Sequence, residues 1–179
     1  MRVTRRSRCQ LQQAKLFMNE IVANACNPEK PFVPVEFEIP QQLESDKFRL
    51  RMLSTEDVDK DYEAVISSAE RLRSLFRDGK GWPREDFTVG ENLEDLRQHQ
   101  KEFECREAFA YTVVSLDETA VLGCVYINPS HHGQAEAEVL MWVRESEYEK
   151  GLDSILFQIV EGWLKDKWPF EKVAYPGRE

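Results

Sequence analysis

Two carboxylates on one expected strand are the best candidates for proton transfer. Glu136 and Glu138 lie in "AEAEVLMWV" (135–143), where alternate positions point to the same face of a strand. A carboxylate can take a proton from a reacting group directly or through water. Both are therefore candidate general bases, and the alternative is a solvated strand face.

A glycine ahead of an amphipathic helix marks a candidate site for an anion. In "SEYEKGLDSILFQIVEGW" (146–163), Gly151 precedes the apolar stripe of the expected helix. A helix N-terminus presents unpaired N–H groups and partial positive charge, and glycine lets the backbone approach a phosphate closely. The alternative is that Gly151 only makes a turn and that Asp153 caps the helix.

Residues that bind metals show no recognisable spacing. His131 and His132 form a loop pair without an identifiable third ligand. The cysteines at positions 9, 26, 105 and 124 contain no C-x-x-C pair, so we expect free thiols in a reducing cytoplasm. Cys124, on an expected strand, is interpreted as a core thiol. The sequence predicts no metal site.

Charge and composition limit the classes of partner. The chain has 179 residues, 41% of them hydrophobic, which suits one globular domain. Its net charge is −9, although residues 1–18 carry basic side chains and no acidic ones. Such an acidic body repels phosphate backbones, so nucleic acid is not an expected partner. No apolar run approaches the ~20 residues of a membrane span.

The expected elements begin with helices around one strand. Residues 1–44 are interpreted as a basic helical extension and linker, and 45–179 as the domain, because 44 residues are too few to bury a core. "KFRLRML" (47–53) alternates like a half-buried strand. "SSAE" (67–70) and "TVGE" (88–91) have capping-box spacing and predict helix starts.

Strands dominate the second half. Three are expected at 108–114, 120–127 and 135–143, followed by the amphipathic helix and a short strand at 172–175. The first two are separated by a connection of hairpin length. We therefore predict a mixed α/β fold with a central, mostly antiparallel sheet flanked by helices.

This order, and the segment "AEVLMWVRESEYEKGLDSILF" (137–157) above all, resembles the GNAT superfamily of acetyl-CoA-dependent N-acetyltransferases. The likeness covers about residues 46–175. The segment is similar to the family's fourth strand and pyrophosphate loop, whose pattern is Gln/Arg-x-x-Gly-x-Gly/Ala ahead of an apolar pair. The resemblance implies transfer of an acetyl group from acetyl-CoA to a primary amine of a small molecule or protein, with Glu138 as the base.

The resemblance also implies how acetyl-CoA would be held. The backbone around Met141, Trp142 and Val143 would bind the pantetheine arm. The pyrophosphate would lie against the following loop. The loop residues implied in this binding are Tyr148, Glu149, Lys150, Gly151, Leu152 and Asp153.

Two loop positions depart from the family's pattern. Tyr148 takes the Gln/Arg place, and Asp153 takes the second Gly/Ala place. A carboxylate ~5 Å from a phosphate repels it by about 3 kcal/mol at an effective dielectric near 20, an effect that Lys150 partly offsets. Replacing Asp153 with glycine is expected to tighten binding. The alternative function is a degenerate, non-catalytic binding or dimerisation module.

The end of the chain departs as well. The family continues past its fifth strand with a helix and a hairpin, and a tyrosine on that helix often protonates the leaving thiolate. Nothing occupies that place here. The strand at 172–175 would then expose an unpaired edge, which we expect residues 30–44 or a second copy of the chain to cover.

Overall fold

The computed structural model describes most of the expected domain. The described residues are 26, 31–76, 81–131 and 133–178. The expected N-terminal helix, the basic residues 1–18 and His132 lie outside them.

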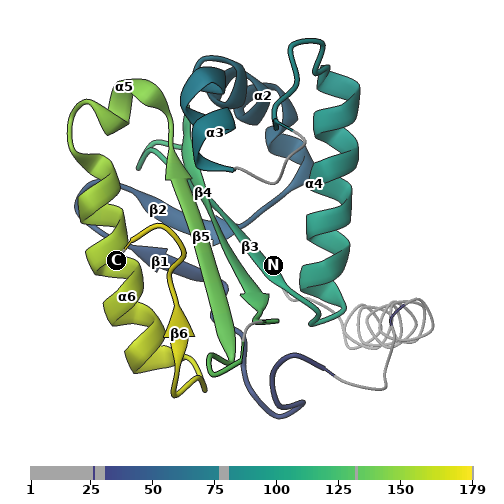
Figure 1. Cartoon of the computed structure of the whole chain (residues 1–179), viewed down its shortest axis with the longest axis vertical. Coiled ribbons are helices and arrows are strands. Elements are labelled where there is room, and N and C mark those ends of the chain that lie inside the picture. Colours follow the sequence, from purple (N-terminus) through teal and green to yellow (C-terminus); the bar gives the residue numbers. More distant parts are fainter. Residues whose placement is uncertain (1–25, 27–30, 77–80, 132, 179) are drawn as a thin grey trace, which may run out of the picture.

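A six-stranded sheet forms the centre of the described chain (Figure 1). The strands are neighbours in chain order, and every pair is antiparallel except the parallel pair of the last two. The strands are β1 Gln42–Glu44, β2 Arg49–Met52, β3 Phe109–Val114, β4 Val121–Pro129, β5 Ala137–Val143 and β6 Val173–Ala174. The predicted mixed fold with a mostly antiparallel sheet is confirmed.

Helices cover both faces of the sheet. They are η1 Thr55–Asp57, α2 Val58–Ile66, α3 Ala69–Leu75, α4 Val89–Glu104, α5 Glu145–Tyr148 and α6 Leu152–Lys167. In Figure 1, α6 lies on one face and α2, α3 and α4 lie on the other. Alternation along β5 serves both layers, because Val139 and Met141 pack in the core with α6 while Trp142 packs in the core with α2 and α4.

The two predicted capping boxes have different outcomes. Thr88 and Glu91 form the reciprocal hydrogen bonds of a capping box at the start of α4, as predicted. The box at Ser67 is wrong, because α3 begins after Ser68 and no side chain caps it. The Ser68 hydroxyl instead accepts a hydrogen bond from the N–H of Glu145 at 2.8 Å. A distant backbone donor has taken the oxygen that the local motif needed.

Strand β1 was not expected, because its residues were assigned to the linker. It pairs with β2, and the segment before it packs on the domain, with Val33 buried and the Tyr111 hydroxyl donating to the carbonyl of Pro40 at 2.6 Å. Among the described strands, β6 pairs with β5 alone. The prediction that residues 30–44 would cover the edge of the last strand is therefore wrong for the described residues, which add their strand at the opposite edge.

The thiol prediction is wrong for two cysteines. Cys26 and Cys105 form a disulfide across 79 residues, at the C-cap of α4. No local spacing announces a bond between such distant positions. Cys124 is free and buried, as expected of a core thiol.

Candidate functional site

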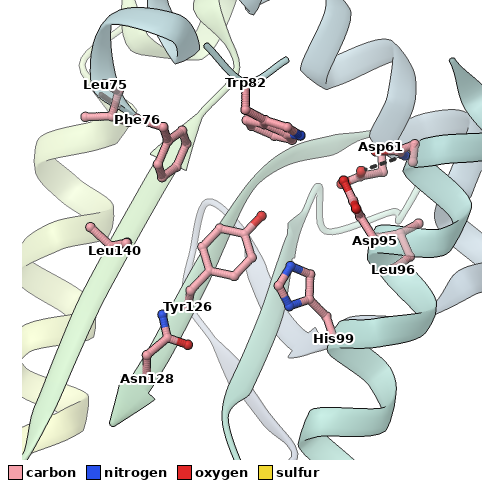
Figure 2. A pocket seen from close by; sticks show the side chains of 11 residues that line it. Asp61, Leu75, Phe76, Trp82, Asp95, Leu96, His99, Tyr126, Asn128 and Leu140 are labelled. Atoms are coloured by element: carbon pink, nitrogen blue, oxygen red, sulfur yellow. Dashed lines mark hydrogen bonds between the residues drawn. The ribbon is translucent and has the colours of Figure 1, made fainter. Parts of the chain in front are cut away.

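A cavity of about 510 Å³ lies between the β4–β5 face and helices α2, α3 and α4 (Figure 2). Its walls are largely aromatic and apolar, with Phe76, Trp82 and Tyr126 around the opening shown in the figure. Its polar groups are Asp61 from α2 and two residues of α4, Asp95 and His99. An apolar hollow with a few convergent polar groups is the usual form of a small-molecule site.

Asp61 is a buried carboxylate at one end of this cavity. Its side chain accepts hydrogen bonds from Nδ2 of Asn92 at 3.0 Å and from the Cys124 thiol at 3.6 Å. Only 4% of the residue is exposed, and no lysine or arginine among the described residues forms an ion pair with it. Burial raises the pKa of Asp61, an effect that these hydrogen bonds oppose. The cavity therefore contains negative charge without a matching cation.

Asp95 adds a second carboxylate from the next helix. It lies four residues before His99, so both side chains face the cavity from one side of α4. Burial raises the pKa of Asp95, and a hydrogen bond with Trp82 counteracts part of that rise. Figure 2 shows the carboxylates of Asp61 and Asp95 on the same side of the cavity.

His99 is placed to exchange a proton with a ligand in the cavity. Its Nδ1 lies 3.1 Å from Oε2 of Glu102, which favours a proton on Nδ1 and leaves Nε2 to accept one. The ring lies 5.1 Å from that of Tyr126. Burial raises the pKa of Tyr126, so its hydroxyl stays protonated; it accepts a hydrogen bond from Nε1 of Trp142 at 3.4 Å.

The two predicted bases occupy different environments. The carboxylate of Glu136 accepts hydrogen bonds from the N–H groups of Glu171 and Lys172, at 2.5 and 3.2 Å, and so holds the approach to β6. Glu138 is half-buried and has no ion pair or hydrogen bond to another described side chain. It lines a neighbouring cavity of about 370 Å³, which shares Asn128 with the larger one. Glu136 is thus structural, and Glu138 is the unengaged carboxylate.

Two arginines cover the backbone expected to bind pantetheine. Nη2 of Arg178 donates to the carbonyl of Met141 at 3.3 Å, and Nη2 of Arg71 donates to the carbonyl of Val143. Strand β6 pairs with β5 only at Ala137 and Glu138. Beyond that point, arginine side chains replace the missing strand as donors to this edge of β5.

The predicted pyrophosphate loop forms a helical turn. The N–H groups of Glu149, Lys150 and Gly151 donate to the carbonyls of Glu145, Glu147 and Tyr148. Gly151 has a φ of 81°, in the left-handed region that favours glycine, and is the N-cap of α6. These three N–H groups are therefore committed to the backbone, and the glycine is required by the turn.

Asp153 pairs with Arg178 instead of capping α6. Both carboxylate oxygens accept hydrogen bonds from the guanidinium, each at 2.8 Å, and α6 has no side-chain cap. The pair lines a second cavity of about 300 Å³ together with Arg71 and Tyr148. This cavity shares Leu75, Phe76 and Leu140 with the larger one. The two hollows therefore meet along β5.

Sequence reasoning did not identify Asp61, Asp95, His99 or Tyr126 as site residues. They come from α2, α4 and β4, and they meet only because these elements pack together. The spacing of Asp95 and His99 was visible as an i,i+4 pair, but that spacing is common on exposed helices. Arg178 carried no signal, because its partner Asp153 lies 25 residues away.

Solved acetyltransferases share this fold. A microcin self-immunity acetyltransferase, solved with acetyl-CoA and AMP, is 13% identical, with a TM-score of 0.62 over 76% of this chain and 73% of that one. An acetyltransferase from Salmonella typhimurium that modifies the N-terminal serine of a 50S ribosomal protein is 14% identical, with a TM-score of 0.57 over 73% and 71%. A protein from Vibrio cholerae described as a ribosomal-protein-serine acetyltransferase is 13% identical, with a TM-score of 0.52 over 68% and 65%.

The chain spans 65% of the length of that Vibrio cholerae protein, slightly less than two thirds. No family model matches the sequence, and no curated protein matches it either. In the described part of the chain, no helix is long and apolar enough to cross a membrane, and no three metal-binding side chains are grouped to hold an ion. The structural likeness confirms the fold that was expected from the resemblance to the GNAT superfamily.

Proposed function

We propose that the chain is an acetyl-CoA-dependent N-acetyltransferase that modifies a primary amine of a small molecule or protein. The observation that carries the proposal is the meeting of two unlike cavities at Leu140. One contains Asp61 and Asp95 and suits a cation, and the other contains Arg71 and Arg178 and suits an anion. A cationic amine and a phosphorylated cosubstrate could meet there.

In this proposal acetyl-CoA occupies the smaller cavity. Its pantetheine arm would lie along Met141, Trp142 and Val143, and its phosphates would lie beside the turn from Tyr148 to Asp153. The Met141 and Val143 carbonyls would exchange their arginine partners for pantetheine N–H groups. The acetyl group would then point toward Leu140 and the larger cavity.

The acceptor is a compact ammonium ion. Asp61 and Asp95 supply negative charge without a paired lysine or arginine, and the rings of Trp82 and Tyr126 favour a cation at their faces. Such a pocket discriminates against neutral and anionic amines. The end of a polyamine and a lysine-like side chain both have the required chemistry.

Proton transfer is assigned to Glu138, with His99 as the group nearest the acceptor. An ammonium ion must lose a proton before its nitrogen can attack a thioester carbonyl. Glu138 is unengaged and adjoins the larger cavity at Asn128, from which it could act through water. The His99–Glu102 pair lines both cavities, with His99 in one and Glu102 in the other, and so connects the amine to Glu138.

The alternative is a non-catalytic module that binds a ligand or a second copy of the chain. The committed N–H groups of Glu149, Lys150 and Gly151 favour it, because they remove donors that a pyrophosphate loop would offer. A homodimer through the β6 edge belongs to either function, since β6 has one neighbour among the described strands.

We also place the chain in the cytoplasm. A reducing cytoplasm opposes the Cys26–Cys105 disulfide. Chain isolated with these thiols blocked during lysis should therefore carry them reduced, and an oxidised pair would argue for an oxidising compartment.

An acetyl-CoA titration followed by thermal unfolding tests the main proposal. Binding at about 100 times the dissociation constant should stabilise the fold by about 2.7 kcal/mol. Mass spectrometry against a panel of amines should then show a gain of one acetyl group on cationic members. Binding without transfer to any amine would support the non-catalytic alternative.

A further inference from the structure

Two arginines from distant parts of the chain face the smaller cavity. Arg71 belongs to α3, and Arg178 follows β6. Asp153 is the one carboxylate that lines this cavity, so its ionised side chains leave a net positive charge. The whole chain, in contrast, carries a net charge of −9. A positive hollow in an acidic chain attracts an anionic ligand selectively.

Arg178 is held in a fixed orientation. Its two terminal nitrogens each donate to an oxygen of Asp153 at 2.8 Å, and Nη2 also donates to the carbonyl of Met141. The guanidinium carbon lies 5.2 Å from the centre of the Phe157 ring. Arg178 and Asp153 are each 18% exposed, so the pair is largely shielded from water. Nε of Arg178 has no partner among the described residues.

Arg71 is held in a matching way on the other side. Its Nε donates to Glu145 at 2.9 Å, and Nη2 donates to the carbonyl of Val143. The guanidinium stacks over the Tyr148 ring at 4.4 Å. Nη1 of Arg71 has no partner in the described part of the chain. Both arginines therefore keep N–H donors for a ligand while their other contacts fix the planes of the guanidinium groups.

We propose that Arg71 and Arg178 bind the phosphate groups of the ligand through their side chains. They would replace the N–H groups of Glu149, Lys150 and Gly151, which the backbone already uses. A guanidinium offers two parallel donors that match the oxygens of a phosphate, and its charge strengthens both bonds. Asp153 and Glu145 are then positioning residues that orient the arginines.

This assignment changes the role of Asp153. Its carboxylate no longer stands alone beside a phosphate, because Arg178 neutralises it at 2.8 Å. The identity of the ligand as a coenzyme A ester rests on the proposed function. The anion site itself rests only on the two arginines and the cavity.

Calorimetric titration of the full chain with three probes tests the anion site. Coenzyme A contains the pyrophosphate and pantetheine together, inorganic pyrophosphate contains only the anion, and pantetheine contains only the arm. Arg178→Gln and Arg71→Gln should each weaken coenzyme A and pyrophosphate binding about tenfold or more and leave pantetheine binding unchanged. Arg97→Gln, which removes an exposed α4 arginine paired with Glu94, is the matched control and should change none of the three affinities.

Unchanged coenzyme A and pyrophosphate affinities in both Gln variants would overturn the proposal, as would equal losses for all three probes. Arg178→Lys keeps the charge but loses the fork, and it supplies the result if the Gln variants do not fold. It should bind coenzyme A several-fold more weakly than the native chain, and equal binding would contradict the proposal. Pyrophosphate binding without acetyl transfer would sink the proposed function alone, whereas transfer unaffected by Arg178→Gln would sink the anion site alone.

Discussion

Arg178 meets Asp153 in two hydrogen bonds of 2.8 Å, and the two residues are 25 positions apart in the chain. The pair joins the segment after β6 to the first turn of α6, at the end of the turn made by Gly151. It gives the carboxylate a counter-charge that the local sequence does not contain. The expectation that Asp153 would repel a phosphate, and that Asp153→Gly would therefore tighten binding, loses its basis.

The ion pair should contribute measurably to stability. Asp153→Asn and Arg178→Gln should each lower the free energy of unfolding by about 1–2 kcal/mol, because each leaves a partly shielded charge without its partner. The double variant should lose less than the sum of the two, with a coupling of about 1 kcal/mol. Urea denaturation of the four proteins measures this cycle. Strict additivity would show that the pair contributes nothing beyond its separate residues.

The two glutamates of β5 should separate into a catalytic and a structural residue. Glu138→Gln should lower kcat about 100-fold with little change in acetyl-CoA affinity, because glutamine keeps the shape but cannot accept the proton. Glu136→Gln should leave kcat nearly intact and lower the Tm, since it weakens the acceptor for the N–H groups of Glu171 and Lys172. Steady-state kinetics and thermal unfolding of both variants decide. The reverse pattern would assign the base to Glu136.

His99→Gln provides a separate comparison within the acceptor cavity. If His99 connects the amine to Glu138, this variant should also lower kcat and should flatten the pH–rate profile between about pH 5 and 8, where histidine titrates. A variant with a native pH profile would remove His99 from the proton path and leave Glu138 acting alone.

Asp61 should cost stability at neutral pH. Because burial raises its pKa above the unfolded value of 3.8, the folded chain keeps the proton at pH values where the unfolded chain has lost it. The free energy of unfolding therefore falls as the pH rises from the unfolded pKa to the folded pKa, and it stays lower above that range. Asp61→Asn should raise the Tm at pH 7, by about 2–4 °C for each kcal/mol recovered.

The same variant should behave differently in acid and with ligand. Its Tm advantage should vanish below about pH 3.8, where Asp61 is protonated in both states. It should also weaken the binding of a cationic amine, since the carboxylate charge is lost. Thermal unfolding across pH, with and without a diamine, checks both. A variant that is less stable at neutral pH would show that the hydrogen bonds from Asn92 and Cys124 outweigh the burial cost.

The Cys26–Cys105 disulfide should stabilise the chain. It closes a loop across 79 residues of separation, which restricts the unfolded ensemble and typically contributes about 2–4 kcal/mol. A reducing agent should lower the Tm of the native chain and leave that of Cys105→Ser unchanged. Equal Tm values with and without reductant would show that the bond contributes no stability.

The exposed edge of β6 should be protected only if a second copy covers it. A dimer should show slow deuterium exchange at Val173 and Ala174 that becomes faster on dilution. Sedimentation of the chain gives its oligomeric state independently. A monomer with freely exchanging amides at these positions would remove the dimer from the proposal.

The sequence by itself determined the kinds and order of most elements. Alternation at 47–53 and in the three central strands, the apolar stripe of α6 and the Thr88–Glu91 box all have the predicted form. These features depend on residues a few positions apart, so their physical cause lies within the window that a sequence pattern covers. The fold could be predicted for the same reason, because this order of elements resembles that of a known superfamily.

Only the tertiary structure decided which residues meet. Ser68 gave up its cap to Glu145, Cys26 joined Cys105, and Arg178 neutralised Asp153, each through a partner 25 or more residues away. The acidic cavity of Asp61 and Asp95 likewise needed α2 and α4 to pack side by side. Charge and hydrogen-bond energies depend on distance in space, and the local pattern of a sequence does not contain that distance.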